Sequence, residues 1–485
     1  MSSARVKQPA DADSPSAIRE RGAVGAALLT VRAAAAQVVA FVGTLVLAHL
    51  LVPSAFGVVA FGTTVVTIGN FFADGGLGAS LIRKPTDPTT DELRTLLALQ
   101  LAVSLAIAVV LAVVGSQAGT TGAVTAIMAA SLPLLALRAP HAIALERALE
   151  YRPIASIDFI ESLAFYGWAI ATVWAGWGVW GFASAAVVRA LVGSVLMTLA
   201  SPLEMLTPRL TRGTLRDMLA FGIGFQAVGM AALARNQGVN LVVVAAGGEQ
   251  VLGFWSLANR LMQVPFWLFM ALWRVSYPTM ARLRALGEDT RQTVERLARI
   301  TALVSGATLA PLTASAHFLI PAMFGARWTS AAAPLPWACA GLVIAGPISV
   351  ATAGYLYSER DVRTPLYATI VNGAVWVVLT AVLLGPMGVA GVGVGWMVAS
   401  WTEAAIFARA LRMRAHVRVE RFILVPVAVA VAAAVIAYAL RPPFASGLAR
   451  GITTAAVALA VYVALSLAFN RPDLLATVRR MRALR

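Results

Sequence analysis

Apolar residues run along this chain in long, nearly uninterrupted stretches. Fourteen stretches of about 20 residues or more are bounded by glycine, proline or charged residues. Each is too apolar for a helix on the surface of a soluble protein and too long for a strand, so the pattern predicts an all-α protein of transmembrane helices. The expected spans are 24–50, 56–81, 94–115, 122–145, 154–176, 179–201, 215–245, 251–280, 297–322, 332–357, 364–384, 388–409, 420–440 and 448–469.

Composition supports a polytopic membrane protein over every soluble class. Of the 485 residues, 59% are hydrophobic and 12% are charged, whereas soluble domains carry about 25% charged residues. Residues 1–21 are polar and lack the order of a signal peptide, so we expect a disordered cytoplasmic tail there. The single cysteine, Cys339, lies in an apolar run, which excludes a disulfide framework and a cysteine-based metal site.

The distribution of positive charge predicts how the spans are oriented. The formal net charge is +16, which in a soluble protein would point to nucleic acid as a partner. Here the basic residues alternate with the spans: if the amino terminus is cytoplasmic, only Arg327, Arg441 and Arg450 fall in outer connections. Cytoplasmic loops of membrane proteins are rich in Lys and Arg. We therefore expect fourteen spans, both termini in the cytoplasm, and no nucleic acid as partner.

Spans 1–6 and 7–12 resemble two copies of one unit. Residues 53–60 (PSAFGVVA) match 249–258 (EQVLGFWSLA), and 178–181 (GVWG) match 388–391 (GVAG). Two six-helix copies have the same orientation, which implies a pseudo-twofold axis along the membrane normal and a cavity between two lobes. The expected domains are a tail at 1–21, an N-lobe at 22–204, a C-lobe at 213–411, helices 13 and 14 at 419–470, and a basic cytoplasmic tail at 471–485.

Charged residues inside the expected spans are candidates for function. An arginine in the middle of a bilayer costs about 2.5–3.5 kcal/mol, so these arginines must pair with acids or line a wet cavity. The basic members, all candidates for substrate binding, are Arg32, Arg138, Arg189, Arg235 and Arg260. The acidic members, candidates for coupling to protons or Na⁺, are Asp74, Asp158, Glu161 and Glu403.

Depth along the spans separates these arginines into two groups. Arg32 and Arg138 fall in the cytoplasmic half together with all four acids, so ion pairing competes with substrate binding for them. The other three fall at mid-depth or farther out, where no acid is expected, and we predict that they line a cavity, with snorkelling to an interface as the alternative. Asp158 and Glu161 share a helix face at i, i+3, where they either share a proton or cation or pair with Arg138 or Arg152.

Polar side chains near the arginines extend the candidate site. On span 8, one helix face carries Arg260, Gln263, Trp267 and Arg274. On span 7, Asn236 and Asn240 lie one turn apart beside Arg235. Guanidinium groups suit phosphate and carboxylate groups because their planar fork donates paired hydrogen bonds.

Seven short stretches resemble a known family in order and spacing from residue 24 to about 410. They are 53–60 (PSAFGVVA), 73–83 (ADGGLGASLIR) with 90–93 (TDEL), 178–181 (GVWG), 221–222 (FG) leading to 234–236 (ARN), 252–265 (LGFWSLANRLMQVP), 277–283 (YPTMARL) and 324–328 (FGARW). The family is the Wzx-type polysaccharide transporters, flippases of the multidrug/oligosaccharidyl-lipid/polysaccharide exporter superfamily.

This resemblance implies a function and a fold. The family has two helical lobes that alternate between inward-open and outward-open states, and it moves polyprenyl-pyrophosphate-linked oligosaccharides from the cytoplasmic to the outer leaflet of the bacterial inner membrane. The implied partners are the lipid-linked sugar, membrane lipids, and polysaccharide polymerase or export components. Family members often have an acid shortly after the Arg-Asn of span 7, where this chain has Gln237-Gly238. Spans 13 and 14 resemble those of the related lipid II flippases.

Two other classes of function stay open at this stage. A cation-coupled drug antiporter of the same fold is one, although a cation exporter should carry acids rather than arginines at mid-depth. A polytopic polysaccharide-processing enzyme is the other, but such enzymes commonly hold acid and base groups on sizeable loops, and no connection here exceeds about 20 residues. No phosphate-binding loop for ATP is present. We expect a non-enzymatic transporter without a cofactor, coupled to H⁺ or Na⁺.

Overall fold

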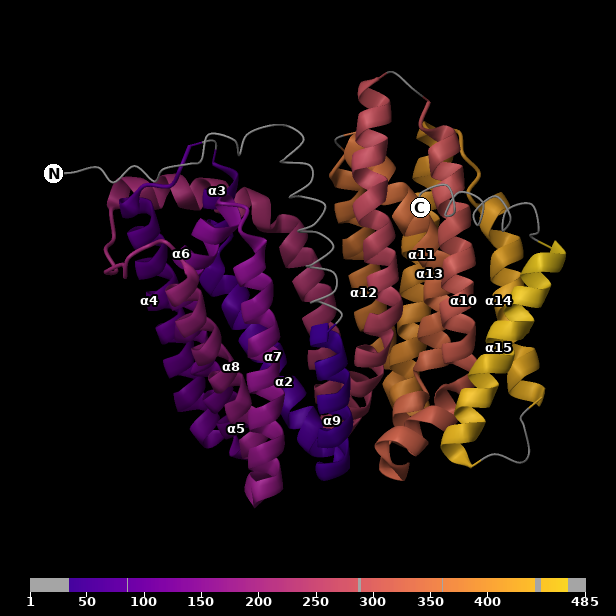
Figure 1. The fold of residues 1–485 in the computed structure, drawn as a ribbon, viewed down its shortest axis with the longest axis horizontal. Coiled ribbons are helices and arrows are strands. Elements are labelled where there is room, and N and C mark those ends of the chain that lie inside the picture. Colours follow the sequence, from indigo (N-terminus) through magenta and orange to yellow (C-terminus); the bar gives the residue numbers. More distant parts are fainter. Residues whose placement is uncertain (1–34, 85, 287–288, 360, 441–445, 470–485) are drawn as a thin grey trace. The chain divides into compact units, whose positions relative to one another are not determined.

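Helices make up nearly all of the backbone (Figure 1). The structure is a computed structural model that describes residues 35–84, 86–286, 289–359, 361–440 and 446–469. Across these ranges no β-strand is present, and eleven helices are long and apolar enough to cross a membrane. Such a chain satisfies its backbone hydrogen bonds inside each helix, as the interior of a bilayer requires.

Two of the eleven apolar helical segments each hold two spans. In 151–200 a short π-helix (Val173–Trp177) joins α7 (Tyr151–Thr172) to α8 (Gly178–Ala200). In 229–270 the helix is broken at Gly248. Trp255 Nε1 donates to Asn240 Oδ1 at 3.2 Å, although fifteen residues of straight helix would hold them about 22 Å apart. The helix therefore doubles back. With these pairs resolved and the apolar helix Ala35–Leu50 added, every predicted span corresponds to a helix.

The chain divides into two compact units. The first comprises Met1–Leu50 and Val65–Phe225, and the second comprises Leu51–Thr64 and Gln226–Arg485. The helices of the first unit, besides Ala35–Leu50, α7 and α8, are α3 (Leu77–Arg83), α4 (Thr90–Gln117), α5 (Gly119–Ala129) and α6 (Ser131–Arg147), together with the second half of α2 (Pro53–Asp74). One of its cores forms where Leu77 and Leu81 of α3 pack with Leu96 and Ile143.

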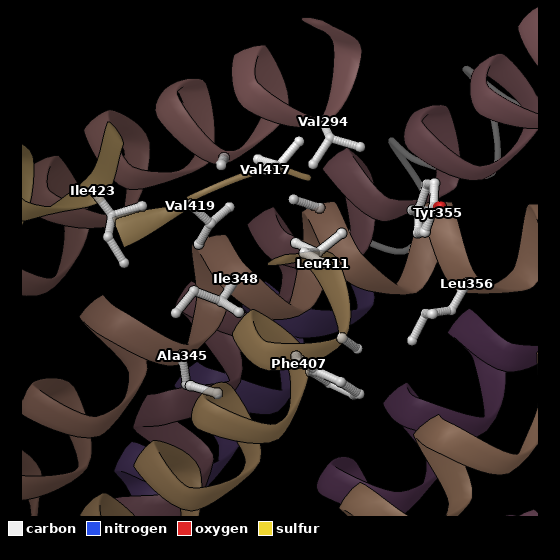
Figure 2. Close-up of a cluster of buried hydrophobic side chains, with 14 of the residues drawn as sticks. Val294, Ala345, Ile348, Tyr355, Leu356, Phe407, Leu411, Val417, Val419 and Ile423 are labelled. Carbon is white, nitrogen blue, oxygen red and sulfur yellow. The ribbon is translucent and has the colours of Figure 1, made fainter. Parts of the chain in front are cut away.

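The second unit holds the long helix α9 from residue 226 onward and all that follows. Its helices are α9 (Arg212–Ala285), α10 (Arg291–Phe324), η2 (Ala326–Ala332), α11 (Leu335–Ser358), α12 (Arg363–Met387), α13 (Val389–Arg414), α14 (Glu420–Leu440) and α15 (Gly447–Phe469). A large apolar core gathers Ile348, Phe407 and Leu411 near one end of the helices (Figure 2). The last helix packs on α10, where Tyr462 donates to the Leu303 carbonyl at 2.8 Å.

Matched glycines mark the internal repeat in the structure. Gly178 is the first residue of α8, and Gly388, paired with it by sequence, immediately precedes α13; both have positive φ, 53° and 57°, which glycine adopts without strain. Gly57 and Gly253 are also paired by sequence. Within the second unit, each of them contacts the segment that contains the other. A Cβ on Gly57 would lie 1.7 Å from the Glu249 carbonyl oxygen, and one on Gly253 would lie 1.9 Å from the Pro53 carbonyl oxygen. The contact is reciprocal, because each glycine faces the residue four positions before the other.

Arg147, the last residue of α6, fixes the connection between α3 and α4. Its Nη1 donates to the carbonyls of Leu81 (2.9 Å), Ile82 (3.1 Å) and Lys84 (2.8 Å), and its Nη2 donates to the Thr86 carbonyl and to the Asp87 carboxylate. The carbonyls at the end of α3 have no partner within the helix, so the guanidinium caps them.

We expect Arg147→Ala to loosen this connection and to lower the free energy of unfolding by about 2–3 kcal/mol, because carbonyls at the helix end lose a charged donor. Faster amide hydrogen exchange over residues 86–93, measured by mass spectrometry on the purified protein, would show it. Arg147→Lys keeps the positive charge but loses the planar guanidinium, so its amide exchange should be faster than in the wild type and slower than in Arg147→Ala. Unchanged exchange in Arg147→Ala would show that the guanidinium does not hold the loop.

Candidate functional site

A buried carboxylate in the first unit binds two guanidinium groups. Glu161 on α7 accepts from Arg138 Nη1 of α6 at 2.5 Å through Oε1, and from Arg189 Nε of α8 at 3.3 Å through Oε2. The Glu161 side chain is 3% exposed, that of Arg138 28% and that of Arg189 52%. Three neighbouring helices thus converge on one acid, and the sequence alternative that paired Glu161 with Arg138 is confirmed.

The prediction that Arg189 has no acid at its level is wrong. Its separation from Glu161 is 28 residues along the chain, and the two helices that carry them pack side by side. Counting positions from the helix ends placed them at different depths, but a long guanidinium side chain reaches past more than one turn. Asp158, one turn before Glu161, is exposed and interacts electrostatically with both arginines.

Asp74 is the last residue of α2, at the point where the predicted span 56–81 divides into α2 and α3. Its carboxylate accepts from the Gly76 amide at 3.2 Å and from Gln100 Nε2 at 2.9 Å. Gly75 and Gly76 both have positive φ, so α2 ends at Asp74 and α3 begins at Leu77. The donors around Asp74 are N–H groups, which fix the position of the carboxylate at the break.

A second polar cluster lies in the second unit between α9, α12 and α13. Asn372 Nδ2 donates to Glu403 Oε2 at 3.1 Å, and Arg235 lies close enough to act on the charge of Glu403. Arg235 Nε also donates to the adjacent Asn236 at 3.1 Å. Sequence reasoning missed Asn372, since a lone asparagine in an apolar span has no local signature.

Asn240 anchors a network of buried indoles. Its Nδ2 donates to Thr64 Oγ1 at 3.1 Å, and its Oδ1 accepts from Trp255. The Trp255 ring packs edge-on against Trp376 and Trp396, at centroid distances of 5.8 and 5.7 Å. These rings are at least 92% buried, so Asn240, itself half-buried, joins its helix to the packed core of the second unit.

Arg260 and Gln263 lie on an exposed face of α9 with Val264 and Trp267. Three members of the predicted polar stripe are thus exposed, and the side chain of the fourth, Arg274, lies outside the described part of the structure. Arg32, the remaining arginine of the predicted site, lies outside the described residues, as do the tails 1–21 and 471–485. Among the described residues, no group of three or more His, Cys, Asp or Glu side chains could hold a metal ion.

A polar cavity of about 610 Å³ opens among helix ends of the second unit. Its charged lining residues are Arg284, Asp289, Arg291, Glu359 and Arg414. Arg284 pairs with Glu359, and Arg414 pairs with Asp361. Burial raises the pKa of Asp361, but hydrogen bonds from Thr364 and Arg414 outweigh it and bring the pKa below its usual value. These ion pairs tie α9 and α13 to the connection between α11 and α12, and they leave the cavity nearly balanced in charge.

Comparisons with known proteins place this architecture. A family model described as polysaccharide biosynthesis protein matches residues 46–333, more than half of the chain. A comparison with curated protein sequences found no match. The lipid II flippase MurJ in an inward closed conformation is similar in structure, with a TM-score of 0.72 and 13% identity over 92% of this chain and 99% of that chain.

An inward-facing multidrug resistance transporter of the MATE family, in the MOP superfamily, is also similar. Its TM-score is 0.57 and its identity 15%, over 81% of this chain and 99% of that chain. At identities this low, what the TM-scores establish is a common fold. The predicted fold class is thus confirmed, and the chain is a polytopic membrane protein that belongs to the polysaccharide biosynthesis protein family.

Proposed function

We propose that this protein moves polyprenyl-pyrophosphate-linked oligosaccharides from the cytoplasmic to the outer leaflet by alternating access. The observation that carries the proposal is the set of guanidinium groups inside otherwise apolar helices: Arg138 and Arg189 in the first unit and Arg235 in the second. Arg189 is half exposed and can present donors to an anion. The pyrophosphate of such a substrate is the ligand that guanidinium donors suit.

The proposal includes a location and a driving force. The charge bias of the connections supports the bacterial inner membrane with both termini in the cytoplasm, where polysaccharide polymerase and export components would be partners. For coupling to H⁺ or Na⁺, we favour Asp74, Asp158 and Glu403 over Glu161, because Glu161 alone of the four accepts from two guanidinium groups. The protein acts in this view as a transporter and not as an enzyme.

Deletion of the gene tests the substrate class directly. We expect a completed oligosaccharide to accumulate on its polyprenyl pyrophosphate, detected by mass spectrometry of lipid extracts, together with loss of the surface polysaccharide. Unchanged lipid-linked pools would favour the drug antiporter instead. Loss of the lipid-linked sugar itself would point to an enzyme acting earlier in the pathway.

Arg235→Ala is expected to lower transport at least about tenfold while the protein still folds, because a guanidinium contact to phosphate is lost. Complementation of the deletion strain, with surface polysaccharide as readout and membrane levels measured by immunoblot, would show it. Arg409→Ala, an exposed position on α13, is the matched control and should complement fully. Wild-type transport by Arg235→Ala would remove this residue from the substrate site.

A further inference from the structure

We propose that Glu161 is a positioning residue that holds Arg138 and Arg189 as a two-guanidinium clamp for a phosphate group, and that it is not a coupling site for protons or cations. The inference rests on the proposed function, since it assigns a place to the phosphate of a lipid-linked substrate. It departs from the sequence prediction, which grouped Glu161 with the coupling acids.

The two arginines are held unequally. Arg138 binds through a terminal nitrogen at 2.5 Å and is the less exposed of the pair, whereas Arg189 binds through Nε at 3.3 Å and is 52% exposed. A contact through Nε leaves both Nη groups of Arg189 pointing elsewhere, and in the described part of the chain they have no hydrogen-bond partner. Arg138 is therefore the anchor, and Arg189 presents four N–H donors to a ligand.

The packing of α8 keeps the Glu161 carboxylate in place. Gly193 is one turn after Arg189, and a Cβ there would lie 1.9 Å from Glu161 Oε1. The missing side chain is thus what makes room for the carboxylate between the helices. Ser194 donates to the Leu134 carbonyl at 2.5 Å and holds α8 against α6. Because the Glu161 carboxylate cannot move in so tight a space, it fixes the positions of the two guanidinium groups that it binds. A supporting residue of this kind sets the geometry of a binding site.

The charge balance favours an anion over a cation. Two guanidiniums around one buried carboxylate leave one positive charge in excess, and both carboxylate oxygens are already occupied. A proton or Na⁺ arriving at Glu161 would meet two like charges within a few ångströms, which opposes its binding. Asp158 brings the local charge back to zero from an exposed position, where solvent screens it more strongly.

Binding of inorganic pyrophosphate to the purified full-length protein in nanodiscs tests the proposal. The Kd, measured by the shift in thermal unfolding, should rise about tenfold or more in Arg189→Ala, whose exposed side chain is not needed for folding. Glu161→Gln and Gly193→Ala should weaken binding as well, because each frees the guanidiniums. Ile160→Ala is the matched control: it changes an exposed apolar neighbour of Glu161 on the same helix and should bind pyrophosphate as the wild type does.

A double variant separates positioning from simple charge neutralisation. If Glu161 serves only to neutralise a buried arginine, Arg138→Gln with Glu161→Gln restores wild-type binding, whereas the clamp predicts that binding stays weak. Wild-type affinity in Glu161→Gln or in Arg189→Ala, or no binding of pyrophosphate to the wild type, would overturn the proposal. Because this probe has neither lipid nor sugar, failure of the flippase proposal would leave the result intact.

Discussion

Replacing Gly253 by alanine is expected to remove most of the folded protein. The added Cβ would meet the Pro53 carbonyl oxygen at 1.9 Å, and the mirror change Gly57→Ala would meet the Glu249 carbonyl oxygen at 1.7 Å. Both obstacles are backbone atoms, which cannot move aside as the end of a side chain can. Overpacking of a well-filled core typically costs about 1–3 kcal/mol, and a backbone clash of this severity lies at or above the upper end.

Thermal unfolding in detergent, followed by the yield of monodisperse protein, would measure this loss. Gly167→Ala is the control, because a Cβ there meets nothing within 4 Å and alanine favours helix over glycine by about 1 kcal/mol. That variant should be as stable as the wild type or more so. Wild-type stability of both Gly253→Ala and Gly57→Ala would show that α2 and α9 do not cross this closely.

Trp255→Ala is expected to destabilise the second unit by about 3–5 kcal/mol, the usual cost of removing a buried large aromatic side chain. The indole is 2% exposed and touches both Trp376 and Trp396, so its loss leaves a cavity between α9, α12 and α13. It also leaves Asn240 Oδ1 without its indole donor.

Denaturant unfolding monitored by near-ultraviolet circular dichroism would report this change. Trp177→Ala serves as the comparison, since that ring is 55% exposed and its loss should alter the unfolding free energy by about 0.5 kcal/mol or less. Trp255→Phe retains an aromatic ring but no N–H donor, and should fall between the two. Equal stability of Trp255→Ala and Trp177→Ala would contradict the packed indole network.

The fold could be predicted from the sequence because its strongest determinants are local. Span length follows from bilayer thickness, and the turn residues between spans are visible as glycine, proline and charge. The glycine pairs 57/253 and 178/388 were also readable, since backbone approach and positive φ each demand glycine. Their roles became clear only from the structure. Gly57 and Gly253 let two helices cross closely, whereas Gly178 and Gly388 lie at the starts of equivalent helices.

The candidate site was predicted as a set of residues but not as a set of contacts. In a helix that is apolar on all sides, nothing in the sequence tells how the helix is rotated, so the partner of a buried charge cannot be read from it. Glu161 and Arg189 lie 28 residues apart, and Asn372 and Glu403 lie 31 apart. The depth argument treated the helices as straight rods, and it misplaced Arg189 relative to Glu161, with which it pairs.

The helix crossing at Gly57 and Gly253 bears on how the internal repeat arose. In an isologous interface between identical subunits, residue i meets j while j meets i, and one mutation changes the contact twice. The glycines and the carbonyls that they face obey this rule within one polypeptide. A homodimer of six-helix subunits would need only one glycine per subunit to make both halves of the crossing. Gene fusion would then have preserved the interface while it freed each copy to acquire its own arginines.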